Sequence, residues 1–153
     1  MSDCSVLIKS WSELTTTELY SILKLRTDVF FIEQKIDEEE LDYRDLEPST
    51  IHYWIEDAAG RAIAYLRVLR DDVPAHLDAR HLIGRVVVRA DHRGEGLAQQ
   101  LLTAALDGLE GEAVLLHAQQ YIAPLYAKAG FEAFGETYFE AGIQHISMYR
   151  AAH

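Results

Sequence analysis

The strongest constraint on the fold is an apolar strand, a glycine-containing loop and a helix that follow one another in residues 82–109. Residues 82–88 form an apolar run rich in β-branched side chains, which predicts a central strand. The loop Arg93-Gly94-Glu95-Gly96 then leads into leucines and alanines at helical spacing. A further apolar run over 113–116 completes a strand, loop, helix, strand unit. This order indicates a mixed α/β fold.

The remaining elements follow from apolar periodicity and turn residues. Thr15 and Glu18 fit a capping box that opens a first helix over 16–31. The apolar runs on either side of the Ala58-Ala59-Gly60 turn predict a hairpin. The predicted strands of that hairpin cover 51–55 and 62–69; a short helix over 121–129 and strands over 134–139 and 143–149 follow. A chain of 153 residues with 49% hydrophobic content fits one domain over residues 1–153, with a mixed central sheet flanked by helices.

Composition excludes several classes of partner. Lysine and arginine number 14 against 25 aspartates and glutamates, and the net charge of −11 opposes binding to nucleic acid or to an anionic membrane. The chain has neither a basic, apolar leader nor an apolar stretch of about 18 residues, so we expect a cytoplasmic protein, either a monomer or a homodimer. The single cysteine, Cys4, cannot form an internal disulfide and is expected to be a bystander. His76, Asp78 and His81 do not complete a ligand set, so no metal is expected.

The glycine loop predicts an anion site. Gly94 and Gly96 allow the backbone to approach a ligand closely, and the free N–H groups of the following helix turn point toward an anion. The loop lacks the lysine and hydroxyl residue of a nucleotide P-loop and the three glycines of a dinucleotide fingerprint, so neither nucleoside triphosphate nor NAD is the expected ligand. An ordinary surface turn before a helix is the alternative.

Through Arg93, Gly96 and Ala98, this loop resembles the pyrophosphate loop of the GNAT superfamily of N-acetyltransferases. From about residue 19 to 149 the chain is also similar to the ElaA-type acetyltransferases. The matching pieces are Leu25-Arg26, Val29-Phe30, Glu33-Gln34, Glu40-Leu41-Asp42, Asp45, Thr50, His52, Arg67, Ile83-Gly84-Arg85-Val86, Arg93-Gly94, Ala118-Gln119, Tyr126, Gly130-Phe131, Gly142-Ile143, His145-Ile146 and Met148. One departure is Ala141, where the family pattern usually has an aspartate after Glu140.

The resemblance implies a GNAT fold, acetyl-CoA as cofactor, and acetyl transfer to the amine of a small molecule or peptide by direct attack on the thioester. The implied cofactor-binding residues are Val86, Val87, Val88, Arg93, Gly94, Glu95, Gly96, Leu97, Ala98 and Gln99. Backbone N–H groups of 86–88 are expected to bind the pantetheine amides and to polarise the acyl carbonyl. Tyr126 is the candidate general acid, because a phenol can protonate the departing thiolate. A packing role on the inner face of its helix is compatible with this chemistry.

Polar side chains on otherwise apolar strands are the candidates for the acceptor pocket. Arg67 and Arg85 each need a carboxylate, and Glu33 and Glu140 are the expected partners. A pre-organised pocket for an amine and a structural ion-pair cluster both account for them. The six acids of residues 37–45 either steer a cationic amine or belong to a solvated loop.

An alkyl ammonium must lose a proton before it attacks, so a general base is also expected. The candidate bases are His52, His117 and His145, each of which is otherwise a satisfied strand histidine. The expected substrate-binding residues are Glu33, His52, Arg67, Arg85, His117, Gln119, Glu140 and His145.

Two other functions remain open from the sequence. A non-catalytic acyl-CoA-binding module would use the same motifs. An acyl-homoserine-lactone-synthase-like acyltransferase shares the Arg26, Val29-Phe30 and Glu33 type of start, but that class usually has a longer chain and lacks this glycine loop.

Overall fold

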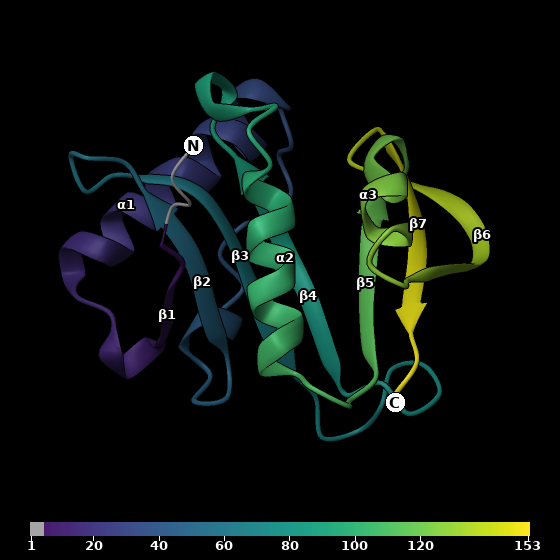
Figure 1. Cartoon of the computed structure of the whole chain (residues 1–153). Helices are drawn as coiled ribbons and strands as arrows, with labels where there is room; N and C mark the ends of the chain where they lie inside the picture. The colour runs from purple at the N-terminus through teal and green to yellow at the C-terminus, as the bar shows by residue number, and fades with distance from the viewer. Residues whose placement is uncertain (1–4) are drawn as a thin grey trace.

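A seven-stranded mixed sheet forms the centre of the computed structural model, which describes residues 5–153 (Figure 1). The strand order is β1-β2-β3-β4-β5-β7-β6, and every neighbouring pair is antiparallel except β4 and β5. The strands are β1 (Leu7–Ser10), β2 (Ile51–Glu56), β3 (Ala62–Arg70), β4 (His81–Val88), β5 (Val114–Gln119), β6 (Glu132–Glu140) and β7 (Ile143–Arg150). Cys4, expected to be a bystander, lies outside the described residues.

Three α-helices accompany the sheet: α1 (Thr16–Arg26), α2 (Leu97–Gly108) and α3 (Ala123–Ala127). The predicted capping box of Thr15 and Glu18 opens α1. The α-helical part of the first helix ends at Arg26, and the chain continues as a π-helix, η2 (Thr27–Glu33). The helix predicted over 121–129 is a 3-10 turn, η5 (Gln120–Ile122), followed by α3. The predicted elements are therefore confirmed with shifted ends, whereas β1 was not predicted.

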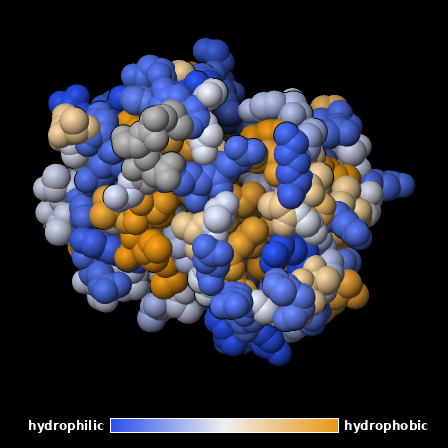
Figure 2. Space-filling view, in the orientation of Figure 1, coloured by the Kyte–Doolittle hydropathy of each residue, from blue (hydrophilic) through white to orange (hydrophobic). Residues whose placement is uncertain are grey.

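The two faces of the sheet bury different clusters. Leu101 of α2 packs in a cluster with Tyr53 and Ile55 of β2. Ile22 of α1 packs in a second cluster with Trp54, whose side chain alternates with those of its strand neighbours. Hence α1 and α2 cover opposite faces. Figure 1 shows α2 and α3 on the near face, and Figure 2 shows apolar patches on both sides of α2 within a largely hydrophilic surface.

The sheet opens between β4 and β5. These strands pair only from His81–Ile83 to Val114–Leu116, and beyond this point they separate (Figure 1). A bulge lies at the start of the opening. Arg67 of β3 pairs with Gly84 of β4, but Tyr65, two residues away on β3, pairs with Val87, three residues away on β4. One extra residue on β4 takes Arg85 and Val86 out of the regular ladder, and Arg85 adopts a left-handed φ of 54°.

None of the helices within residues 5–153 is both long and apolar enough to cross a membrane.

Candidate functional site

A cavity of about 340 Å³ lies where β4 and β5 separate. Its walls come from both halves of the sheet, from η2 and the acidic loop after it, and from α3. Of the residues predicted for the site, those lining the cavity are Arg67, Arg85, Val86, His117, Gln119, Tyr126, Glu140 and His145. The structure thus brings together one end of the predicted cofactor stretch, the candidate acid and most of the candidate acceptor residues.

A second pocket, of about 200 Å³, lies at the glycine loop. Its lining includes Val88, Arg93, Gly94, Gly96, Leu97, Ala98 and Gln99 of the predicted cofactor residues. Gly96 is the N-cap of α2 with a φ of 77°, and it offers no side chain to cap the first turn. The N–H groups of that turn are therefore available to an anion.

Two members of the predicted cofactor set line neither pocket. The Val87 side chain is buried in the α1-facing cluster, so only its backbone is left for a ligand. The Glu95 carboxylate lies 3.1 Å from Nδ1 of His92.

Tyr126 is a buried phenol in the cavity wall, with 4% of its surface exposed. Burial, and secondarily the nearby Tyr121, raise the pKa of the Tyr126 hydroxyl, so it keeps its proton at neutral pH. The ring packs edge-on against Phe131 at 6.2 Å, which fixes its position. Within residues 5–153 the hydroxyl has no hydrogen-bond partner, so it remains available as a donor.

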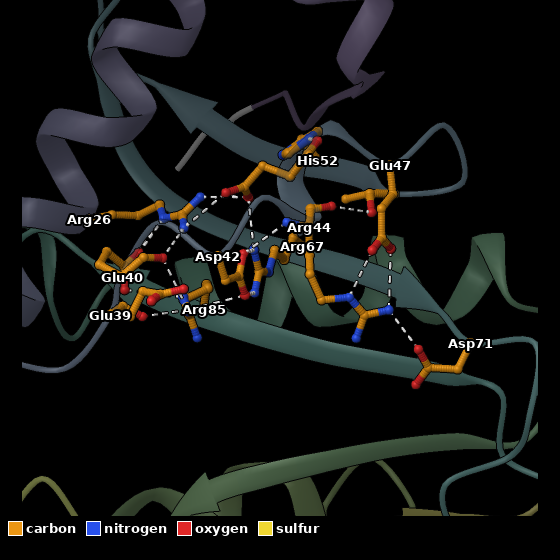
Figure 3. Close-up of polar contacts among 12 residues, drawn as sticks. Arg26, Glu39, Glu40, Asp42, Arg44, Glu47, His52, Arg67, Asp71 and Arg85 are labelled. Atoms are coloured by element: carbon orange, nitrogen blue, oxygen red, sulfur yellow. Dashed lines mark hydrogen bonds and ion pairs between the residues drawn. The ribbon is translucent and has the colours of Figure 1, made fainter.

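Arg67 and Arg85 are bound by the acidic loop and not by Glu33 or Glu140, so the predicted pairing was wrong (Figure 3). Arg67 donates to Asp42 at 2.6 and 2.9 Å and to Asp45 at 3.0 Å. Nε of Arg85 lies 3.1 Å from the Glu40 carboxylate. Sequence spacing alone could not tell which of the many acids fold back onto the sheet.

A third arginine completes this network. Arg26, which is 1% exposed, contacts Glu40 at 2.5 Å and Asp45 at 2.8 Å. Burial alone would raise the pKa of the Asp45 carboxyl, but hydrogen bonding and charge from Arg26 and Arg67 lower it overall. The same balance of burial against Arg67 lowers the pKa of Asp42. The second half of the acidic loop, residues 40–45, is therefore held in a fixed position at the site by these ion pairs. Asp37, Glu38 and Glu39 in the first half are exposed.

The missed contributors to the site are Glu40, Asp42, Asp45 and Arg26. The resemblance to the ElaA-type enzymes includes all four, and that was the signal that could have identified them. In addition, Nε of Arg67 is buried without a hydrogen-bond partner among residues 5–153, and the buried Nε of Arg85 makes no hydrogen bond either, because its N–H does not point at the Glu40 carboxylate that lies 3.1 Å away. Such unsatisfied donors favour a polar ligand.

Glu33 lies at the cofactor loop, not in the cavity. Its carboxylate forms a two-pronged ion pair with Arg93 at 2.6 and 2.8 Å, and this hydrogen bonding lowers the pKa of Glu33. Arg93 also donates from Nε to the Val88 carbonyl oxygen at 3.1 Å. Glu33 therefore holds the loop arginine and not, as predicted, an acceptor.

His52 is likewise absent from the cavity, which corrects its prediction as a substrate contact and base. Its Nε2 lies 3.1 Å from the Asp45 carbonyl oxygen and its Nδ1 2.7 Å from the Tyr65 hydroxyl. A carbonyl only accepts, so Nε2 donates and Nδ1 accepts from the tyrosine. Nε2 therefore holds the acidic loop against the sheet, while the bond from Tyr65 of β3 to Nδ1 fixes the ring.

His117, Gln119 and His145 share one face of the opposite wall. In the β5–β7 register His117 pairs with Ser147 and Gln119 with His145, so all four side chains point the same way. Nδ1 of His117 lies 2.9 Å from the Ser147 hydroxyl. Gln119 donates to the Gln34 side chain at 3.1 Å, which links this wall to the segment after η2.

Comparison with known proteins places the chain among acyltransferases of known fold. A family model described as an acetyltransferase (GNAT) domain matches residues 24–151. The crystal structure of an acyl-CoA N-acyltransferase from Pseudomonas aeruginosa is 38% identical, with a TM-score of 0.86 over 97% of this chain and 100% of that one. Escherichia coli ElaA is 32% identical, with a TM-score of 0.87 over 97% of this chain and 99% of that one.

A more distant likeness shows the fold alone. The CoA-dependent acyl-homoserine lactone synthase BjaI, solved with SAM and isopentyl-CoA, is 17% identical, with a TM-score of 0.76 over 96% of this chain and 82% of that one. The family-model match, in contrast, contains the glycine loop, Tyr126 and the whole β4–β5 opening.

Proposed function

Because the chain belongs to the GNAT acetyltransferase family, which transfers acyl groups from acyl-CoA, we propose that it is an N-acetyltransferase using acetyl-CoA. Its acceptor in this proposal is the amine of a small molecule or peptide.

One observation carries the proposal: the glycine-loop pocket and the β4–β5 cavity adjoin the same strand end. Val88 lines the first and Val86 the second. A coenzyme A molecule with its pyrophosphate on the α2 N-terminus would therefore run its pantetheine arm along residues 86–88 and deliver the thioester beside Tyr126.

The β4 bulge suits the carbonyl of that thioester. Arg85 and Val86 leave the ladder there, so backbone donors are freed from strand pairing at the edge of the cavity. Fixed N–H groups of this kind stabilise the oxyanion that forms when an amine attacks a carbonyl. The neutral Tyr126 hydroxyl then protonates the leaving sulfur.

The cavity contains carboxylates that have no ion-pair partner, and these favour a cationic acceptor. Among the described residues, Glu38, Glu39 and Glu140 line the cavity without any ion pair, whereas Arg67 and Arg85 are already paired. Uncompensated carboxylates attract an ammonium group.

The test is thiol release from acetyl-CoA in a panel of amines, with the acetylated product identified by mass spectrometry. The panel contains alkylamines, diamines, amino-acid esters, short peptides and S-adenosylmethionine. Amine-dependent thiol release with matching amide formation is expected. Coenzyme A binding without turnover across the panel would favour a non-catalytic binding module. Acylation confined to S-adenosylmethionine would favour an acyl-homoserine-lactone-synthase-like activity, by analogy with BjaI.

A further inference from the structure

We propose that His145 is the general base of this enzyme and that its Nε2 atom takes the proton from the acceptor's ammonium group. This role rests on the proposed acetyl transfer and assigns one of its proton-transfer steps to a specific atom.

The position of the His145 ring is fixed within the cavity wall. The residue is 9% exposed, and in the sheet it lies between Gln119 of β5 and Tyr138 of β6. Its ring stacks on Tyr138, with centroids 5.7 Å apart and planes 22° apart. A base held in this way needs little reorganisation to meet a bound amine.

A backbone contact fixes which nitrogen is basic. Nδ1 of His145 lies 2.7 Å from the carbonyl oxygen of Ile143. The carbonyl can only accept, so Nδ1 carries the proton and donates it. In the neutral ring Nε2 then holds the lone pair, and no residue within 5–153 occupies it.

The other titratable groups of this wall are less suited to the task. His52 uses both ring nitrogens outside the cavity. His117 contacts the Ser147 hydroxyl, which can either donate or accept, so its tautomer is not fixed. Glu140 lines the same wall, where its carboxylate has no ion-pair partner among residues 5–153 and is assigned to attracting the ammonium group.

His145 and Tyr126 belong to opposite faces of the sheet. Tyr126 packs in the cluster with Leu116, Ala118 and Ile146, whereas His117, Gln119 and His145 alternate with those residues. The base therefore meets the amine from one side of the opening, while the acid meets the sulfur from the other.

The proton balance closes with these two groups. Nε2 takes one proton from the ammonium and becomes imidazolium, and the freed nitrogen lone pair forms the N–C bond. The C–S bond then breaks, its electron pair leaves with sulfur, and sulfur takes the Tyr126 proton. A second proton shed by the new amide nitrogen restores Tyr126, so the products are the amide, the free thiol and protonated His145.

The first test is His145→Asn, since an asparagine amide can still donate to the Ile143 carbonyl but offers no basic nitrogen. His76→Asn is the matched control, because His76 also stacks on an aromatic ring of β6, that of Phe134, yet does not line the cavity. With butylamine as acceptor, His145→Asn should lower turnover about a hundredfold or more, the usual scale of general-base catalysis. Affinity for acetyl-CoA should stay within twofold, and His76→Asn should keep wild-type turnover.

The second test replaces butylamine by O-propylhydroxylamine, which has nearly the same shape but an unprotonated nitrogen at neutral pH. His145→Asn should then lower turnover less than about tenfold, because little proton removal is needed before attack. If His145→Asn lowered turnover equally with both amines, the role of His145 as base would be overturned, but the proposed acetyl transfer would not. If the wild type released no thiol with any amine of the panel, the proposed acetyl transfer itself would be overturned.

The third test needs no turnover. Long-range ¹⁵N–¹H NMR of the histidine rings, with the His145 signals assigned by their loss in His145→Asn, should show the proton on Nδ1 and a bare Nε2. A neutral ring protonated on Nε2 would contradict the proposal.

Discussion

The Tyr126 hydroxyl combines burial, a retained proton and a place in the cavity wall. Tyr126→Phe keeps the ring and its packing on Phe131 but removes the proton donor. We expect turnover to fall about a hundredfold or more. The dissociation constant of acetyl-CoA, measured by calorimetry, should hardly change, because the hydroxyl acts only as the sulfur leaves.

Tyr53→Phe is the control for that change. Tyr53 is also buried and also has its pKa raised by burial, but it packs in the core against α2 and lines neither pocket. Unaltered turnover in Tyr126→Phe, or an equal decline in both variants, would remove Tyr126 from the mechanism.

The two cavity arginines should respond differently to the same substitution. Arg67 is 2% exposed and holds two carboxylates, so Arg67→Leu leaves buried charge uncompensated and should lower the free energy of unfolding by about 3–5 kcal/mol. Arg85 is more accessible, so Arg85→Leu should lower stability less and mainly raise the KM for the amine. Urea unfolding and steady-state kinetics on both variants measure this. A KM for acetyl-CoA that rises as much as that for the amine would contradict the assignment of Arg85 to the acceptor side.

At the scale of elements, the glycine loop is defined by two left-handed residues before α2. Gly96→Val should weaken coenzyme A binding at least about tenfold, because a branched side chain at the N-cap blocks close approach of a phosphate. The same change also strains a backbone with a φ of 77°.

Gly60→Val separates these two effects. Gly60 has a φ of 78° in the β2–β3 turn, and a side chain there meets nothing within 4 Å. Both variants should lose similar stability, about 1–3 kcal/mol, from the strained backbone. Only Gly96→Val should lose affinity in a calorimetric titration with coenzyme A; parallel losses in both would argue against the loop as the phosphate site.

The acidic loop makes stability dependent on pH. Asp42 and Asp45 have pKa values lowered in the folded protein, so each binds its proton more readily when unfolded. Their contribution is complete above the ordinary aspartate pKa of about 3.9 and is lost as the pH falls through the lower folded values. The free energy of unfolding should therefore decrease steeply below about pH 4, and less steeply in Arg67→Leu, as followed by circular dichroism in urea. Equal slopes in the two proteins would contradict this origin.

At the scale of the whole molecule, local signals predicted most of the sheet and missed what depends on tertiary contacts. The strands β2 to β7 are long enough for their apolar pattern to be read, whereas the four residues of β1 are too few. Periodicity also could not show that the first helix changes to a π-helix after Arg26. Both elements were positioned by packing that the sequence does not display locally.

The site divides in the same way. The glycine loop and Tyr126 were identified because they form short contiguous motifs, and the structure places them at adjoining pockets. The partners of Arg67 and Arg85 were missed because those carboxylates lie 22 to 45 positions away along the chain. His52 was misplaced because alternation in a strand gives the face of the sheet but not the depth of burial.

The short β4–β5 pairing has a mechanical consequence. Among residues 5–153, three residue pairs of backbone ladder join the β1–β4 half to the β5–β7 half, so we expect the sheet to flex more readily along this seam than elsewhere. A coenzyme A molecule held between the halves would contact both and stiffen the seam, because a ligand stabilises the arrangement of the protein to which it binds. Hydrogen–deuterium exchange at residues 84–88 and 117–119 should therefore slow when coenzyme A is added, while exchange in the β2–β3 hairpin stays the same. Coenzyme A would then act as a removable crosslink between the two halves of the sheet. In each turnover the β4–β5 seam would become more rigid when the cofactor binds and more flexible when it leaves.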